Sequence, residues 1–288
     1  MVRGRLYALA SAACFATLGV FTIKGYDSGA GEFELLCARI IGSAVVLGGL
    51  GLAMRVTLPR GRPLALVLGL GGFQLGTTAG LLVGFSHAPA GLIVLLFYVY
   101  PVLVSIGAAV LYDEPFGRRQ TLILCLGLAG VALTAGRPGS VPLVGILLGL
   151  FAGVCTTGYF LGGRYVLSRG VEPLAISTLL YLSPAVVLVA AAAVRGFDVP
   201  TFSAWAYASG IVMIGTVIPI LMLFTAIRLI GAGITALLST IEPFLAVVLA
   251  YVILDERLTT TQLVGGACIL VAVVVSALPP RSIAAHPA

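Results

Sequence analysis

The chain has 288 residues, of which 60% are hydrophobic and 9% are charged, and its formal net charge is +6 at pH 7. This composition excludes an ordinary soluble domain and indicates a membrane protein. The basic residues, all arginines except Lys24, lie mostly between apolar stretches, where they orient a chain in a membrane. The net charge therefore does not predict a nucleic-acid partner.

Ten apolar stretches follow one another along the chain. A helix needs about 20 apolar residues to cross a bilayer core, so these stretches predict ten transmembrane helices, numbered here as spans 1 to 10. Their expected ranges are residues 5–25, 32–54, 63–85, 89–111, 117–135, 141–163, 172–194, 203–225, 232–253 and 260–278. Basic residues concentrate in alternate loops, which predicts a multi-pass membrane protein with both termini in the cytoplasm.

Spans 4 and 9 carry the same residue pattern, because residues 90–120 match residues 232–262 at a constant offset. The residues of the first copy that recur in the second are Ala90, Gly91, Leu95, Leu96, Pro101, Leu103, Ala108, Val110, Asp113, Glu114 and Gln120. Weaker matches relate the earlier spans of the first half to those of the second half, and one of them pairs Lys24 with Arg164. The chain is therefore expected to be an all-α membrane protein of ten helices in two five-helix repeats, residues 1–138 and 139–288. Since five is odd, the second repeat is expected to be inverted in the membrane.

Glu242 is the carboxylate that lies deepest within an expected span, about 15 Å into span 9 at 1.5 Å per residue. A carboxyl group at that depth needs a partner or a water-filled cavity. Two interpretations stay open. Glu242 either binds a substrate amine or a proton, or it is a structural carboxyl bonded to neighbouring helices.

Pro101 and Pro243 occupy equivalent positions in the two copies. Each proline lacks an N–H and displaces the carbonyl four residues earlier, at Phe97 and Ser239. In lipid such carbonyls need other partners or must face a cavity. The prolines are expected to act as hinges that shape a central cavity, with a static kink as the alternative.

Polar and aromatic side chains at mid-depth are the remaining candidates for a cavity lining. Each is weighed against ordinary packing or hydrogen bonding between helices. The expected cavity residues are Thr17, Gln74, Thr78, Tyr98, Tyr100, Thr157, Tyr159, Ser239 and Glu242. Thr77 is considered with Gln74 and Thr78. Such a lining, mostly apolar and aromatic with a few hydroxyls, suits amphipathic solutes.

Other residues in the spans are expected to have structural roles. Arg39 lies about 10 Å below the outer end of span 2, and it is expected to snorkel outward or to pair with a buried acid or carbonyl. The Asp113–Glu114 and Asp255–Glu256 pairs are too shallow for a mid-depth substrate, so they are interpreted as helix-boundary or gating contacts. Glycines spaced by four in span 3 and span 6 predict close helix packing; they are Gly72, Gly76, Gly80, Gly84, Gly145, Gly149 and Gly153.

The paired pattern of a mid-helix proline, an Asp-Glu pair and a Gln that opens the next helix resembles the EamA type of the drug/metabolite transporter superfamily. Arg39 also looks like that family's arginine in the second helix. In length and aromatic content the chain is most similar to YddG-type amino acid exporters. The resemblance implies a ten-helix exporter of small metabolites, with a cavity lined mainly by spans 1, 3, 4, 6, 8 and 9 and with spans 5 and 10 peripheral.

The expected function is that of a secondary transporter that exports amino acids, including aromatic ones, or similar small amphipathic metabolites by alternating access. The alternative is a multidrug exporter of lipophilic cations. Cation antiport usually uses a symmetric pair of carboxylates, whereas Glu242 has Tyr100 as its counterpart, which favours uncharged or zwitterionic cargo. The expected partners are a small-molecule substrate and the lipid bilayer, with no nucleic acid, and the chain is expected to be a monomer.

Enzyme classes find little support in the sequence. The two histidines lie in an expected loop and in the C-terminal segment, which leaves no Ser/His or Cys/His dyad. No phosphate-binding GxxxxGK[ST] motif is present, and no CxxC or Cys/His cluster predicts a metal site. The chain is therefore expected not to be an enzyme and to use no cofactor or metal.

Overall fold

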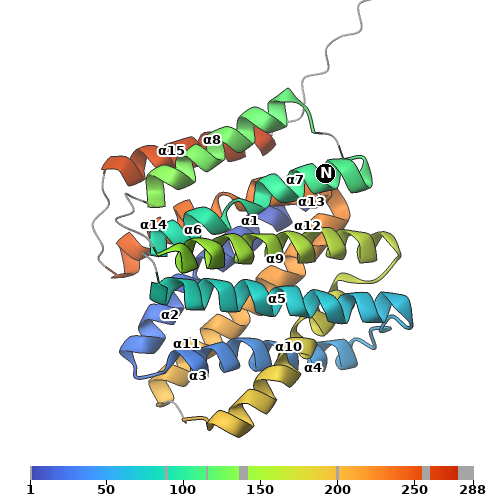
Figure 1. Ribbon diagram of the computed structural model, residues 1–288. Coiled ribbons are helices and arrows are strands. Elements are labelled where there is room, and N and C mark those ends of the chain that lie inside the picture. Colours follow the sequence, from blue (N-terminus) through green and yellow to red (C-terminus); the bar gives the residue numbers. More distant parts are fainter. Residues whose placement is uncertain are drawn as a thin grey trace, which may run out of the picture.

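The computed structural model describes residues 2–87, 90–114, 116–135, 142–198, 201–254 and 260–277 (Figure 1). Within these ranges every regular element is a helix. The segment around Arg137 where the two halves were expected to meet lies outside the described residues, and so does the Asp255–Glu256 pair.

Spans 1 to 5 are built from nine helical elements, several of which are parts of one interrupted helix. They are α1 (Val2–Ala16), α2 (Leu18–Asp27), α3 (Glu32–Cys37), the π-helical turn η1 (Ala38–Gly42), α4 (Ser43–Ala53), α5 (Arg62–His87), α6 (Ala90–Phe97), α7 (Tyr100–Tyr112) and α8 (Arg118–Ala135).

Spans 6 to 10 contain the remaining elements. They are α9 (Leu143–Ser168), α10 (Pro173–Arg195), α11 (Phe202–Val212), the π-helical turn η2 (Met213–Val217), α12 (Ile218–Ile230), α13 (Ala232–Ser239), α14 (Glu242–Leu254) and α15 (Thr260–Ala277).

Seven helices of the described chain are long and apolar enough to cross a membrane. They cover Val2–Asp27, Glu32–Ala53, Arg62–Leu81, Leu143–Ser168, Pro173–Arg195, Phe202–Ile230 and Ala232–Ile253. Shorter apolar helices cover Tyr100–Tyr112 and Leu263–Val275. The all-helical, multi-span architecture agrees with the sequence, whereas the exact number of ten spans stays a prediction.

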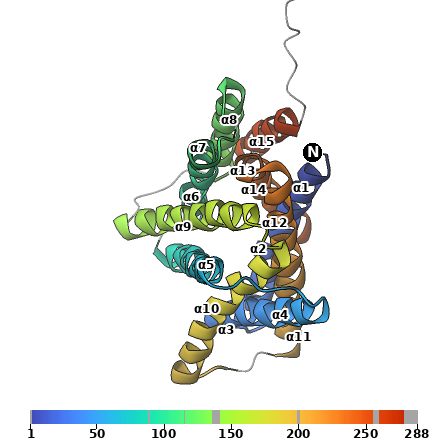
Figure 2. The same ribbon diagram turned by 90° about the vertical axis from the view of Figure 1, so that its right-hand side faces the viewer.

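Helix packing relates the two halves by an approximate two-fold. Span 3 packs on span 6 (α5 on α9), and span 8 packs on span 1 (α12 on α1), so exchanging the halves converts one pair into the other. Spans 5 and 10 pair with each other as α8 and α15, and α7 of span 4 packs on α13 of span 9. Both ribbon views place α8 with α15 at one end of the molecule and α10 with α4 at the other (Figures 1 and 2).

Spans 4 and 9 are both interrupted in mid-helix, immediately before the repeated prolines. Span 4 breaks between α6 and α7, where Val99 N–H donates to the carbonyl of Leu96, three residues earlier. Span 9 breaks between α13 and α14, where Thr240 N–H donates to Leu237 in the same way. The tight turns place residues 98–99 and 240–241 at the middle of their spans, and this is where proline makes regular helix unfavourable.

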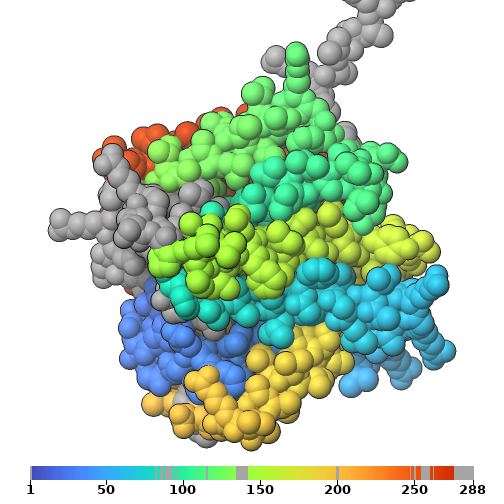
Figure 3. Space-filling model, in the orientation of Figure 1, coloured from blue at the N-terminus to red at the C-terminus, as the bar shows by residue number. Residues whose placement is uncertain are grey.

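Glycines allow the close packing of α5 on α9 that is visible on the face in Figure 3. A β-carbon at Gly80 would lie 3.1 Å from the carbonyl oxygen of Leu148 and one at Gly76 would lie 2.7 Å from the sulfur of Cys155. Gly72 differs from the expected stripe, because nothing lies within 4 Å of its β-carbon position. The close-packed surface of α5 is thus shorter along the helix than the four-residue spacing predicts.

Gly130 gives a direct test of the α8–α15 contact. A β-carbon there would lie 2.6 Å from the carbonyl oxygen of Gly265 and 3.0 Å from the amide nitrogen of Ile269, and backbone atoms cannot turn aside. Gly130→Ala is therefore expected to destabilise the fold by about 1–3 kcal/mol and to lower the melting temperature in detergent. Gly72→Ala is the matched control, since the added methyl meets open space and alanine favours helix. Equal melting temperatures for the two variants would contradict this packing.

Candidate functional site

Four tyrosines from three spans gather at mid-depth, and we call Tyr98, Tyr100, Tyr159 and Tyr181 the tyrosine cluster. Tyr98 and Tyr100 flank the break in span 4, with ring centroids 5.6 Å apart. Phe160 joins Tyr100 to Tyr159, with centroid distances of 5.4 Å and 5.3 Å. All four tyrosines are buried. The cluster is a rigid aromatic wall with hydroxyl groups at its edges.

Glu242 faces this cluster from the break in span 9. Its carboxyl interacts with the Tyr98 hydroxyl and lies within electrostatic range of Tyr100 and Tyr159. Although it begins α14 in the middle of a span, Glu242 is only partly buried. A partly exposed polar group at this depth is compatible with a cavity lining.

Arg39 approaches the same cluster from η1 of span 2. Its guanidinium lies within electrostatic range of Tyr159, Tyr181 and Glu242. Tyr181 in turn accepts a hydrogen bond of 3.3 Å from Gln74 Nε2. Arg39 therefore faces the tyrosine cluster, which favours the second of the two alternatives given for it, an interaction with a buried acid, over snorkelling outward.

The other predicted cavity residues make contacts mainly within their own helices. Thr78 Oγ1 donates to the carbonyl of Gln74 at 3.0 Å, and Ser239 Oγ donates to Thr235 at 3.0 Å. Ser239 also lies beside the Tyr100 hydroxyl. The hydroxyls of Thr17 and Thr157 donate to Cys14 and Gly153 in the same fashion. Of these four residues, Ser239 is the one that the structure brings to the tyrosine cluster.

Thr156 was missed by the sequence reasoning. Its hydroxyl lies 3.0 Å from that of Thr77, linking span 6 to span 3, and it also interacts with Tyr159. Tyr181 of span 7 was missed as well. Neither residue stands out in the sequence, because a hydroxyl in an apolar helix can face any side.

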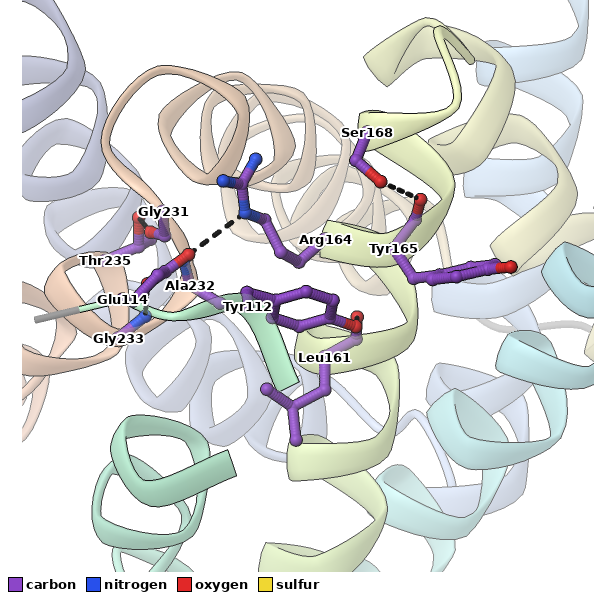
Figure 4. Close-up of polar contacts among 10 residues, drawn as sticks. All are labelled: Tyr112, Glu114, Leu161, Arg164, Tyr165, Ser168, Gly231, Ala232, Gly233 and Thr235. Carbon is purple, nitrogen blue, oxygen red and sulfur yellow. Dashed lines mark hydrogen bonds and ion pairs between the residues drawn. The ribbon is translucent and has the colours of Figure 1, made fainter. Parts of the chain in front are cut away.

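A second polar centre lies at one end of the bundle, and we call it the Glu114 clasp (Figure 4). The Glu114 carboxylate accepts hydrogen bonds from the backbone N–H groups of Ala232 (3.1 Å) and Gly233 (3.0 Å) at the start of α13. It also pairs with Arg164 Nε of α9 at 3.0 Å. This is the one ion pair between described residues. A carboxylate at a helix N-terminus is favoured by the unpaired N–H groups and by the helix dipole.

Gly231 makes this approach possible. Its φ of +85° with a ψ of 166° belongs to a region that essentially only glycine occupies. A β-carbon at Gly231 would collide with the Glu114 carboxylate. Glycine is therefore required here both for the backbone conformation and for room beside Glu114.

The Glu114 clasp also contacts neighbouring side chains and lines two pockets. Tyr112, two residues before Glu114, donates to the Leu161 carbonyl at 2.6 Å and lies 6.0 Å from the Arg164 guanidinium. Glu114 lines two pockets, one of about 40 Å³ and one of about 230 Å³ that also includes Arg228. Spans 4, 6 and 9 are thus joined at this end. The sequence analysis predicted a gating or boundary contact for Glu114 but did not identify its partners.

Metal ligands do not gather anywhere in the described part of the chain, where no group of three His, Cys, Asp or Glu side chains could hold an ion. The five cysteines are free thiols.

A two-repeat bundle of apolar helices, broken in mid-membrane beside a polar and aromatic cluster, is the architecture of a membrane transporter. The comparisons agree with this class. The chain belongs to the EamA-like transporter family, whose model matches residues 2–136 and again residues 143–278. It is therefore a multi-pass membrane protein with two copies of the family's domain.

Similar proteins carry the same class in their names. The chain is 28% identical over 223 residues to an uncharacterized transporter of Archaeoglobus fulgidus, an alignment that covers 75% of this chain and 77% of that one. It is 26% identical over 200 residues to the uncharacterized transporter YetK of Bacillus subtilis, covering 65% of this chain and 60% of that one. A solved crystal structure superposes with a TM-score of 0.82 at 20% identity, covering 95% of this chain and 96% of that one, which shows the fold.

Proposed function

We propose that the chain is a secondary transporter that exports amino acids, including aromatic ones, or similar small amphipathic metabolites across the bacterial inner membrane. It works as a monomer, with both termini in the cytoplasm and the second repeat inverted relative to the first. The observation that carries this proposal is the tyrosine cluster with Glu242, which combines aromatic surface and polar groups at the breaks of two opposed helices. Sites at such breaks suit amphipathic solutes.

Alternating access follows from the same arrangement. In this orientation the Glu114 clasp lies on the cytoplasmic side, so it joins spans 4, 6 and 9 below the tyrosine cluster. The structure then corresponds to a carrier that is closed toward the cytoplasm. Export requires the clasp to open so that cargo can enter from the cytoplasm, and the prolines after both helix breaks give the hinges for that motion.

Counterflow in proteoliposomes tests the proposal. Vesicles loaded with unlabelled phenylalanine or leucine are expected to accumulate the same labelled amino acid from outside, at a rate at least ~10-fold above protein-free vesicles. Tetraphenylphosphonium, a lipophilic cation, serves as the competing cargo. Accumulation of the cation without any amino acid would replace this proposal with the multidrug alternative.

A further inference from the structure

Arg39 is a charged group within a span whose hydrogen-bonding capacity is only partly used by the described residues. Its Nε atom is buried without a hydrogen-bond partner. Burying such a donor in a membrane costs free energy, and proteins usually retain such a group only where it serves a function. The Tyr181 hydroxyl, which accepts from Gln74, also forms a hydrogen bond with the Arg39 side chain, so Nε is the donor that these contacts leave without a partner.

Glu242 presents the opposite charge nearby without touching Arg39. The two side chains lie within electrostatic range of each other, yet they are not among the ion-paired residues of the described chain, so more than 4.0 Å separates their charged atoms. Both side chains are also partly exposed, although each lies within a span. A small molecule that carries both charges is complementary to an acid and a base that are held apart beside an aromatic cluster.

We infer that Arg39 and Glu242 are the two anchors of one zwitterion site, in which the guanidinium binds the cargo's carboxylate and the Glu242 carboxyl binds its ammonium group. This inference rests on the proposed transport function and narrows its cargo. Guanidinium matches a carboxylate with two parallel N–H donors. The tyrosine cluster holds the cargo's side chain, and Gln74 positions Arg39 through Tyr181.

The same geometry argues against lipophilic cations. Such a molecule has no carboxylate to neutralise Arg39, and two cations would then share a site of low dielectric. A simple carboxylic acid meets the converse problem at Glu242. The site therefore discriminates by requiring both charges on one small molecule, at a spacing that bridges Arg39 and Glu242.

Binding to the purified full chain tests the inference independently of transport. Calorimetry with phenylalanine, phenethylamine and 3-phenylpropionate compares molecules that share a ring and differ only in their charged groups, and leucine with isoamylamine and isocaproate forms a second set. The amino acid of at least one set is expected to bind at least ~10-fold more tightly than its two analogues. An amine that binds as well as its amino acid overturns the inference while leaving the transport proposal intact. Failure of both amino acids to bind also overturns the inference, and the counterflow experiment then decides separately whether transport stands.

Variants assign each charge to its residue. Arg39→Gln is expected to weaken amino acid binding at least ~10-fold while changing amine binding less than ~3-fold. Glu242→Gln is expected to weaken amino acid binding at least ~10-fold while changing binding of the acid analogue less than ~3-fold. Arg195→Gln is the control, since this arginine lies at a span end over the Phe33 ring at 4.7 Å. Equal losses for amine and amino acid in Arg39→Gln overturn the assignment. If that variant does not fold, the analogue series on the native chain still decides, because it needs no substitution.

Discussion

Oxidation of the double variant Ala108→Cys/Gly233→Cys is expected to stop transport, and reduction is expected to restore it. A β-carbon at Gly233 would lie 3.7 Å from that of Ala108, within the ~3.5–4.5 Å that disulfides span. The bond would fix α7 of span 4 to α13 of span 9 beside the Glu114 clasp. Because alternating access requires this side to open, a covalent link there should lower counterflow by more than ~10-fold.

A matched cross-link elsewhere separates this effect from disulfide formation itself. Gly127→Cys/Ala272→Cys joins α8 to α15, where the corresponding β-carbon distance is 3.8 Å. That pair is peripheral, so transport is expected to persist when it is oxidised. The single-cysteine variants control for reactions of the native thiols. Full activity of the oxidised Ala108–Gly233 pair, with the bond verified by mass spectrometry, would rule out opening at the Glu114 clasp.

Glu114→Gln is expected to weaken closure on the same side. The substitution keeps the shape of the side chain but removes the charge that accepts from two backbone amides and from Arg164. Hydrogen bonds to a charged group contribute about 1.5–3 kcal/mol each, so even a partial loss shifts the closed population about 10-fold or more. Transport should fall, because a carrier that seldom closes toward the cytoplasm seldom releases cargo outside.

Accessibility measures this shift directly. Ser105 lines the pocket of about 40 Å³ beside Glu114, so a cysteine at this position should react faster with an impermeant thiol reagent from the cytoplasmic side when Glu114→Gln is present. Asp113→Asn is the matched control. Asp113 is exposed and has a φ of +52°, a conformation that asparagine tolerates. Similar labelling rates in both variants would show that Glu114 does not hold the clasp.

Features set by local sequence could be predicted. Apolar stretches predicted an all-helical, multi-span membrane protein, because a helix in lipid satisfies its own backbone groups. Pro101 and Pro243 marked the breaks in spans 4 and 9, since the loss of an N–H acts on the neighbouring turn whatever the rest of the fold does. Tyr98 and Tyr100 were proposed as site residues because they flank the first of those breaks, and Glu242 because it is the carboxylate that lies deepest within an expected span.

Features that depend on how distant helices meet could not be predicted. The partners of Glu114 come from spans 6 and 9, and two of them are backbone amides, which every residue except proline possesses. The choice between the two alternatives for Arg39 could not be made from the sequence for a different reason. The π-helical turn at Ala38–Gly42 adds a residue to the helix and rotates the faces that follow, so a regular helical projection does not show which side of span 2 faces the bundle.

The Glu114 clasp also bears on how the family's sequences can change. Two of the three donors to Glu114 belong to the main chain, so no substitution elsewhere can recreate them around a different side chain. Arg164 contributes through its side chain and can be exchanged for another donor from a nearby position. We therefore expect substitution of Arg164 to be tolerated more readily than substitution of Glu114 or Gly231.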